Sequence, residues 1–177
     1  MAFEVAKACR LPLDILVVRK LGAPGAEELA MGAIASGGFL VLNDDLLRRF
    51  HVTEKKLKQT IEQETREMER RERLYRSGQS PIEVAGRTAI LVDDGLATGA
   101  SMRVAIRAVS DRARRVIVAV PVGAESTCVE LARLADRVIC ALNPEPLDAV
   151  SLFYREFAPP SDEEVKALLQ QVPDFSD

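Results

Sequence analysis

The chain has 177 residues, of which 47% are hydrophobic and 29% charged, a balance typical of one globular domain and unlike that of a disordered chain. Its net charge of −3 provides no basic field to attract nucleic acid. No apolar run approaches the ~20 residues of a membrane span, and charged residues interrupt the N-terminal stretch, which therefore lacks a signal peptide's apolar core. We expect a cytoplasmic protein with no nucleic-acid or membrane partner.

Residues that often bind metals or act as covalent catalysts are scarce. His51 is the single histidine, which excludes His pairs and His-rich zinc sites, and we expect a surface or capping residue there. Cys9, Cys128 and Cys140 are odd in number, far apart and without a C-x-x-C pair, which argues against a disulfide framework or a cysteine metal site. We expect no metal held by the protein alone, and we expect Cys128 and Cys140 to be small core residues.

The first elements in chain order are a helix over 1–10 and a strand over 13–20. The strand is apolar on both faces, as in the interior of a parallel sheet. Residues 28–36 and 39–43 flank Gly37-Gly38, a pattern that favours a hairpin.

A highly charged helix is predicted over 53–76. Its apolar residues form a narrow stripe, which consists of Leu57, Ile61, Met68 and Tyr75. Two interpretations stay open for this segment: a peripheral helix that leans on the domain, or a weakly anchored, mobile flap within 43–80.

The second half alternates strands with helices. Strands are predicted over 88–92, 115–122 and 137–142, with helices over 98–113 and 125–135 between them. Ser161 and Glu164 form a capping box for a last helix. The alternation predicts an α/β fold with a parallel sheet flanked by helices, and we assign residues 1–177 to a single domain.

The segment 89–101, AILVDDGLATGAS, carries most of the chemical information. Asp93 and Asp94 follow an apolar strand directly, at the edge where open α/β sheets bind ligands, and two carboxylates there can accept hydrogen bonds from a vicinal diol or from metal-bound water. Small residues and hydroxyls then lead into a helix start whose free N–H groups favour an anion. A diol site beside a phosphate cradle predicts a ribose 5-phosphate site.

Two other interpretations of this segment are weaker. A single Asp at a strand end is often only a cap or turn former, which does not explain two carboxylates followed by T-G-A-S. A phospho-acceptor domain also has acidic residues at strand ends, but it needs a further Asp and a Lys on later strands, and the sequence does not supply that pattern.

ILVDDGLATGAS resembles the PRPP-binding motif of the type I phosphoribosyltransferases, where PRPP is 5-phosphoribosyl 1-diphosphate. Residues 18–38, 74–87 and 148–165 resemble one branch of that family, so the resemblance covers essentially the whole chain. It implies a Rossmann-type fold with a hairpin and helical flap, and a hood or C-terminal helix within 143–177.

The resemblance also implies site residues and partners. Asp93 and Asp94 would hold the ribose hydroxyls, and Arg19 and Lys20 would lie near the pyrophosphate, although solvated strand-end charges explain both cations as well. The residues that would cradle the 5-phosphate are Ala97, Thr98, Gly99, Ala100 and Ser101. Mg²⁺ would arrive bound to PRPP, and a homodimer is expected by analogy.

The implied reaction displaces pyrophosphate from the ribose C1 by a nitrogen base or another amine, as part of nucleotide metabolism. It needs aligned substrates and charge stabilisation more than acid–base groups, in keeping with a single histidine. A flap within 43–80 would exclude water. Base specificity would come from the hood over 143–160, whose aromatic residues Phe153, Tyr154 and Phe157 could stack on a base or simply pack in the core.

The sequence departs from the family at its N-terminus. The family places a strand and a Gly-containing pyrophosphate loop before the first helix, whereas Met1 stands where that helix begins. The resemblance therefore predicts a sheet that lacks its first core strand, between the strands at 13–19 and 88–92. Three interpretations follow: an enzyme, a non-catalytic module that binds PRPP or a nucleotide, or a truncated inactive form.

Overall fold

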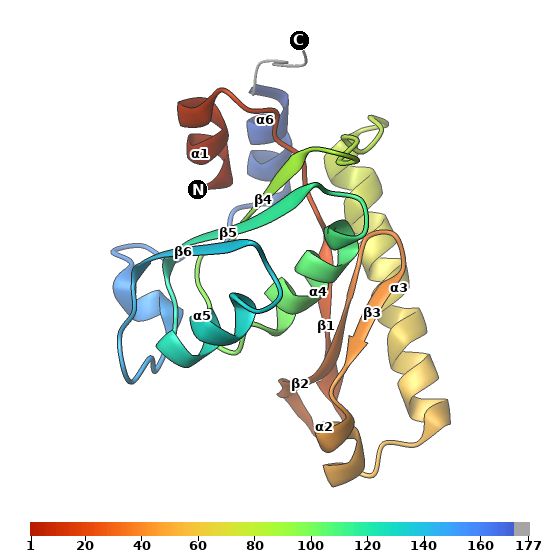
Figure 1. Ribbon diagram of the computed structural model, residues 1–177. Helices are drawn as coiled ribbons and strands as arrows, with labels where there is room; N and C mark the ends of the chain where they lie inside the picture. Colours follow the sequence, from red (N-terminus) through yellow and green to blue (C-terminus); the bar gives the residue numbers. More distant parts are fainter. Residues whose placement is uncertain (172–177) are drawn as a thin grey trace.

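The computed structural model describes residues 1–171 and arranges them as two three-stranded sheets with helices on their faces (Figure 1). Residues 172–177, the end of the predicted single domain and hood segment, lie outside the described residues. The antiparallel sheet comprises β1 (Val18–Ala23), β2 (Ala26–Ala35) and β3 (Phe39–Leu42). The parallel sheet comprises β4 (Thr88–Val92), β5 (Arg115–Val122) and β6 (Arg137–Leu142). The helices are α1 (Ala2–Cys9), α2 (Asp44–Arg49), α3 (Glu54–Arg76), α4 (Ala100–Ser110), α5 (Glu125–Leu131), η1 (Val150–Phe153) and α6 (Asp162–Gln171).

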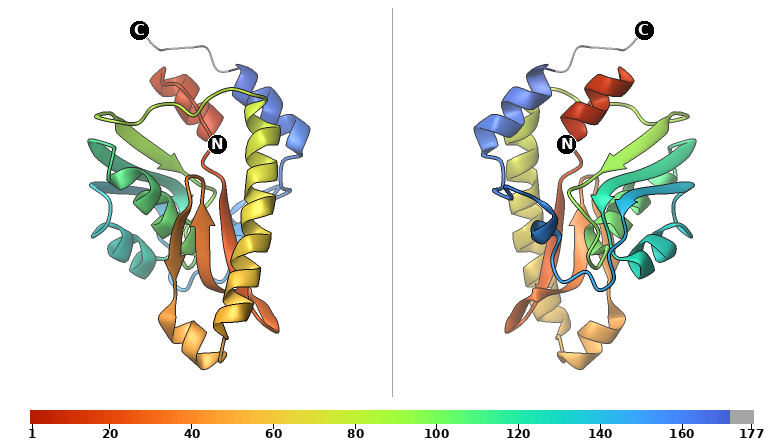
Figure 2. Two further views of the ribbon diagram at one scale, coloured as in Figure 1. Left: turned by 90° about the vertical axis from the view of Figure 1, so that its right-hand side faces the viewer. Right: turned by 90° about the vertical axis from the view of Figure 1, so that its left-hand side faces the viewer.

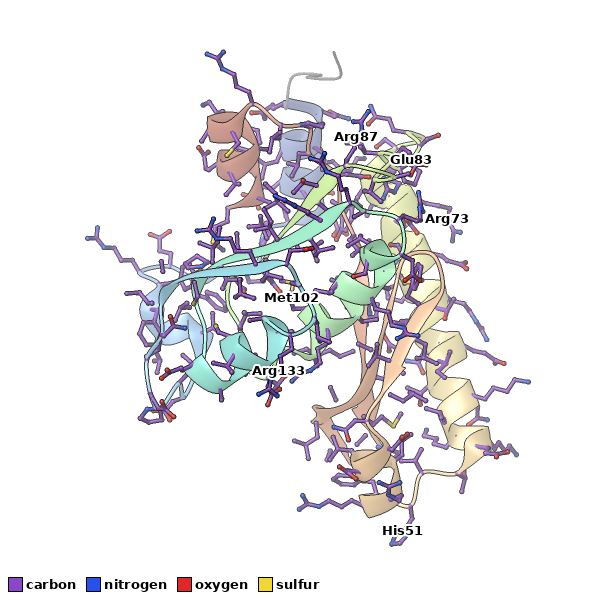
Figure 3. The ribbon with its side chains drawn as sticks, viewed as in Figure 1. His51, Arg73, Glu83, Arg87, Met102 and Arg133 are labelled. Atoms are coloured by element: carbon purple, nitrogen blue, oxygen red, sulfur yellow. The ribbon has the colours of Figure 1, made fainter. Side chains whose placement is uncertain are left out.

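The predicted α/β class is confirmed by the parallel sheet and its helices. β5 alternates exposed or half-buried residues with fully buried ones; the buried set is Val116, Val118, Val120 and Val122. Met102 and Ile106 of α4 belong to one core cluster with the first three of these valines, and Figure 3 labels Met102 on α4. This core fixes the carboxyl end of β4, where the predicted site lies.

The predicted hairpin is confirmed and forms the second sheet. β2 and β3 pair antiparallel around Gly37 and Gly38, whose φ angles of +87° and +81° require glycine. β1 pairs antiparallel with β2 and ends at Ala23, three residues beyond the predicted end of this strand. The pairing of β1 with β2 shifts in register around Gly22, as at a β-bulge.

The predicted strand over 13–20 is wrong for its first five residues. Residues 13–17 have no regular secondary structure, and β1 begins at Val18. A strand needs a neighbour for its hydrogen-bond ladder. Val17 still bonds to Ser36, directly after β2, but the Ile15 carbonyl accepts from the Arg76 side chain instead of from a strand. Its apolar pattern still reflects packing, since Leu16 and Val18 lie against the core.

α4 joins the two sheets. Its residues contact β1, β2 and β3 on one side and β4 and β5 on the other, and both views in Figure 2 show the sheets side by side with this helix next to them. Small side chains allow a close approach: Ala33 and Ala35 of β2 pack on Val104 and Ala108 of α4.

The charged helix predicted over 53–76 is α3, which Thr53 caps through a hydrogen bond to the Lys56 N–H. It lies on the face of the antiparallel sheet away from α4 (Figure 2), with Met68 buried in that interface. Arg76 anchors its C-terminal end because its guanidinium contacts the Asp14 carboxylate and the Ile15 carbonyl.

Three other local predictions are confirmed, whereas the helix predicted over 125–135 ends at Leu131, as α5. In α6, the Ser161 Oγ accepts from the Glu164 N–H at 3.2 Å and the Glu164 carboxylate accepts from the Ser161 N–H at 2.7 Å, as a capping box requires. His51 is exposed at the end of α2, far from the parallel sheet (Figure 3). Cys128 and Cys140 pack at the edge of the core as free thiols. Among residues 1–171, no helix has the length and hydropathy to cross a membrane.

Candidate functional site

The two carboxylates of the predicted site stand at the carboxyl end of β4. Asp93 and Asp94 are both half-buried, and the Asp93 Oδ1 accepts a hydrogen bond from the Asp94 N–H at 2.9 Å. Burial raises the pKa of Asp93 above the usual aspartate value, and the negative charge of Asp94 raises it further. The hydrogen bond from the Asp94 N–H and the positive charge of Lys20 both lower this pKa. The pair therefore concentrates negative charge beside one cation.

The loop after the carboxylates is anchored in the core by Leu96. This side chain is 1% exposed, its N–H donates to the Val122 carbonyl at 2.9 Å, and its carbonyl accepts from the Ala124 N–H at 2.9 Å. Gly95 lies so close to its neighbours that a Cβ would stand 2.7 Å from both methyl groups of Val150. The chain path from Asp94 to α4 is thus fixed by packing.

Side chains of α5 and α4 bind the carbonyls of the loop. The Thr127 hydroxyl donates to the Ala97 carbonyl at 2.6 Å, and the Arg103 guanidinium donates to the Thr98 carbonyl at 3.0 Å. Arg103 is itself held by Glu130 at 2.9 Å. These contacts orient the peptide groups of the loop without using its N–H groups.

The start of α4 is available to an anion. Gly99 occupies the N-cap with a φ of +69°, and no side chain caps the first turn of this helix. The N–H groups of such a turn carry partial positive charge and have no partner within the helix. The hydroxyl of Ser101 belongs to the same turn, and Ala97 and Thr98 are exposed in front of it. The geometry suits a phosphate next to the two carboxylates.

β1 separates the two predicted cations. Successive side chains of a strand point to opposite faces, and Arg19 points toward α3, where it forms an ion pair with Glu64 at 2.7 Å. Lys20 points to the other face, and its charge acts on Asp93. Arg19 therefore lies on the α3 side of the sheet, whereas Lys20 lies on the other face, from which its charge lowers the pKa of Asp93.

The segment after β6 returns to the site. The Tyr154 hydroxyl donates a short hydrogen bond to the Asp94 carbonyl, and the Tyr154 ring lies 5.1 Å from that of Phe157. Burial, together with Asp94 and Asp93, raises the pKa of Tyr154, so this hydroxyl keeps its proton as a donor. Phe153 and Phe157 are 42% and 44% exposed, and Leu152 is 71% exposed. The segment that binds the main chain of Asp94 thus carries exposed apolar side chains.

The structure brings together most of the predicted site residues. The carboxylates and the loop residues lie together after the carboxyl end of β4, Lys20 acts on Asp93 through its charge, and Arg19 is held on the other face of β1 by Glu64. Three contacts could not be found from the sequence: Thr127 to the loop, Arg103 to the loop, and Tyr154 to Asp94. Their partners lie 30, 5 and 60 residues away in the chain, and no local pattern marks them. Across residues 1–171, no three His, Cys, Asp or Glu side chains come together as a metal cluster.

The sequence and the fold of the chain are similar to those of known proteins. A family described as the phosphoribosyl transferase domain matches residues 15–148, which is 134 of the 177 residues. The chain therefore belongs to the phosphoribosyl transferase family, as its resemblance to the type I enzymes indicated. The matched residues include β4 and the whole 93–101 loop.

Individual relatives agree with the family. Two proteins from two strains of Mycobacterium tuberculosis, each named "putative phosphoribosyl transferase", are 42% identical over 172 residues, 97% of this chain. The chain spans only 39% of the length of these curated relatives. The crystal structure of TT1426 from Thermus thermophilus matches with a TM-score of 0.77 and 37% identity, over 96% of this chain and 81% of that one.

Proposed function

We propose that this chain binds PRPP together with Mg²⁺ and transfers its phosphoribosyl group to a nitrogen base, with release of pyrophosphate. The proposal rests mainly on the arrangement of one loop. Asp93 and Asp94 precede the start of α4, where Gly99 makes no side-chain capping hydrogen bond, and the Thr127 hydroxyl binds a carbonyl of the loop between them. A diol and a phosphate separated by one sugar ring are the groups that fit these two features.

Each group then has a defined role. Asp93 and Asp94 accept hydrogen bonds from the two ribose hydroxyls, and the N–H groups of residues 98–101 bind the 5-phosphate with help from the Thr98 and Ser101 hydroxyls. Lys20 faces the developing charge of the leaving pyrophosphate. Arg19 has no role in the proposal because Glu64 holds it on the other face of β1.

The reaction requires little acid–base chemistry from the chain. The bond between C1 and the diphosphate oxygen breaks, the electron pair leaves with pyrophosphate, and a bond from C1 to the base nitrogen forms. The nitrogen loses its proton to solvent. The contribution of the site is alignment and electrostatic stabilisation of separating charge, consistent with a site that contains carboxylates, a lysine and backbone donors.

Mg²⁺ fits this donor set as part of the substrate. Magnesium in proteins is commonly held by one or two carboxylates and by substrate phosphates, with water completing the shell. Asp93 and Asp94 supply such carboxylates, and no larger cluster is present within residues 1–171. When bound with PRPP, the ion would neutralise charge on the diphosphate.

The acceptor would stack on the apolar side chains beside Asp94. Tyr154 and Phe157 form a tilted pair, and Phe153 and Phe157 are partly exposed. A planar base can use such surfaces through stacking. The second candidate is a module that binds PRPP or a nucleotide without turnover. It is favoured by the ion pair of Arg19 with Glu64, which leaves Lys20 as the one of the two predicted pyrophosphate cations on the other face of β1.

Calorimetric titration with Mg·PRPP tests the proposal. We expect saturable binding that Asp94→Asn weakens by at least about tenfold, since a lost charge-assisted hydrogen bond costs about 1.5–3 kcal/mol. Asp111→Asn is the matched control because Asp111 is exposed at the opposite end of α4. Pyrophosphate release on addition of bases distinguishes an enzyme from a binding module. Equal affinities of the two variants would contradict the assignment of the site.

A further inference from the structure

Two cysteines from different elements come together behind the loop that follows β4. Cys128 belongs to α5 and Cys140 to β6, and these two elements contact each other (Figure 1). A Cβ placed on Gly123 would stand 3.0 Å from the Cys128 Sγ and 3.3 Å from the Cys140 Sγ. Both sulfurs therefore adjoin the same small space, which the glycine leaves open, and the Cys128 side chain is near enough to hydrogen-bond with that of Cys140. Both side chains are half-buried free thiols, so a small molecule can reach them.

The hydrogen bonds around the two sulfurs differ. The Cys140 thiol donates to the Leu142 carbonyl at 3.1 Å, whereas the Cys128 sulfur accepts from the Asn143 side-chain amide at 3.3 Å. Burial, the charge of Cys128 and the hydrogen bond with Cys128 raise the pKa of Cys140 to about 11. The thiolate is the reactive form of cysteine, and Cys140 keeps its proton at neutral pH. Cys128 is therefore the sulfur that reacts first with an oxidant.

The thiol pair is connected to the loop after β4 by direct contacts. Thr127, the residue before Cys128 on α5, donates its hydroxyl to the Ala97 carbonyl at 2.6 Å. The Asn143 amide that binds the Cys128 sulfur also donates to the Gly123 carbonyl at 3.2 Å. A displacement of the Cys128 sulfur thus acts on the loop through the neighbouring residue of the same helix.

We propose that Cys128 and Cys140 form a reversible disulfide on exposure to hydrogen peroxide, and that this bond weakens the hydrogen bond of Thr127 to the loop. The two sulfurs of a disulfide lie about 2.0 Å apart, which is closer than two thiols in contact, so the bond draws α5 toward β6. Thr127 moves with α5, whereas the loop is held separately by Leu96 in the core. Neither part of the proposal depends on the proposed function, because neither requires a bound substrate.

The oxidation consumes one peroxide for each disulfide. The Cys128 thiolate attacks a peroxide oxygen, the O–O bond breaks, and Cys128 becomes a sulfenic acid while the hydroxide that leaves takes up a proton as water. The charge of Cys128, one cause of the raised pKa of Cys140, is then gone. The Cys140 sulfur attacks the Cys128 sulfur, and its proton leaves with the hydroxyl group as a second water. A dithiol reductant reverses the reaction by thiol–disulfide exchange.

Mass spectrometry of the peroxide-treated chain tests the proposal. Cys9 is exposed on α1, and Cys9→Ser removes it as a source of bonds between chains. The folded Cys9→Ser chain is treated with hydrogen peroxide, the free thiols are alkylated, and the peptides are analysed without reduction. We expect a linked pair of peptides that contains Cys128 and Cys140. Its rate of formation should not depend on protein concentration, and dithiothreitol should remove it.

Single-cysteine variants of the Cys9→Ser chain test the order of the two steps. With Cys140→Ser, Cys128 has no partner, so we expect a sulfenic acid that dimedone traps. With Cys128→Ser, we expect Cys140 to react at least about tenfold more slowly, because burial, the largest cause of its raised pKa, remains. Equal rates for the two variants would contradict this order. If either variant does not fold, the linked peptide of the Cys9→Ser chain decides.

Amide chemical shifts of the ¹⁵N-labelled Cys9→Ser chain test the connection to the loop. We expect oxidation to shift the amides of Thr127 and of residues 97–99, dithiothreitol to restore them, and the amides of α3 to stay unchanged as the internal control. The absence of a linked peptide in the folded chain, or its formation only in urea, would overturn the proposal. A linked peptide with unchanged amides over 97–99 would overturn the effect on the loop.

Discussion

Gly99 at the N-cap of α4 provides a quantitative test of how the loop is held. Its φ is +69°, and a Cβ added there would stand 2.7 Å from the Thr127 Cγ2. The left-handed conformation costs an L-residue about 1–2 kcal/mol. Thr127 is buried and β-branched, so it can move only by weakening its hydrogen bond to the Ala97 carbonyl, which costs about 1 kcal/mol. We expect Gly99→Ala to lower the free energy of unfolding by about 2–3 kcal/mol.

Two further variants separate backbone strain from the clash. Gly86 has a φ of +71° and no atom within 4 Å of the point where a Cβ would stand, so Gly86→Ala should show the strain alone, about 1–2 kcal/mol. Adding Thr127→Ser to Gly99→Ala removes the clashing methyl group and keeps the hydroxyl, and should restore about 1 kcal/mol. Urea denaturation measures the unaltered chain and the three variants. Equal losses for Gly99→Ala and Gly86→Ala, or no recovery with Thr127→Ser, would refute this account of the loop.

Three further predictions concern other contacts. The Arg76 side chain is 11% exposed and binds the Asp14 carboxylate and the Ile15 carbonyl, so Arg76→Gln should lower the free energy of unfolding in urea by about 2–3 kcal/mol. The Arg73 side chain is 73% exposed, so Arg73→Gln, the control, should change this free energy by less than about 0.5 kcal/mol. Burial raises the pKa of Asp93, so the contribution of this residue to stability is present below the pKa of an unfolded aspartate and is lost as pH rises through the folded value. Asp93→Asn should therefore raise the free energy of unfolding at about pH 7 and leave it unchanged at about pH 3. A lower free energy of unfolding for this variant at about pH 7 would argue against the burial effect. Tyr154→Phe removes the hydrogen bond to the Asp94 carbonyl and should lower the free energy of unfolding by about 1 kcal/mol, measured by thermal unfolding. The same variant should bind Mg·PRPP more weakly in calorimetry. Unchanged affinity would show that Tyr154 does not contribute to the site.

The sequence predicted the elements that depend on local patterns. The apolar run 88–92 ended by two aspartates identified β4 and the carboxylates, and the glycine pair at 37–38 identified the hairpin. The capping box at Ser161 identified the start of α6. Each of these features is encoded within a few neighbouring residues, so one sequence suffices to find it.

Contacts between distant segments were harder to predict. Residues 13–17 have the composition of a buried strand but lack a partner strand among the described residues, and strand formation depends on that partner. Thr127 reaches Ala97 from 30 residues away because α5 packs beside the loop. The alternation of β1 did contain a usable signal, since Arg19 and Lys20 are adjacent and only one of them can face the carboxylates.

Mapping of amide chemical shifts measures directly whether residues 93–101 bind a ribose 5-phosphate. Ribose 5-phosphate is titrated into the ¹⁵N-labelled chain, with ribose alone and phosphate alone as controls. We expect the largest shifts at the amides of Asp94, Gly99, Ala100 and Ser101, with saturation at lower concentrations than either control. Shifts centred on the α3 face around Arg19 and Glu64, or none at the start of α4, would contradict this expectation.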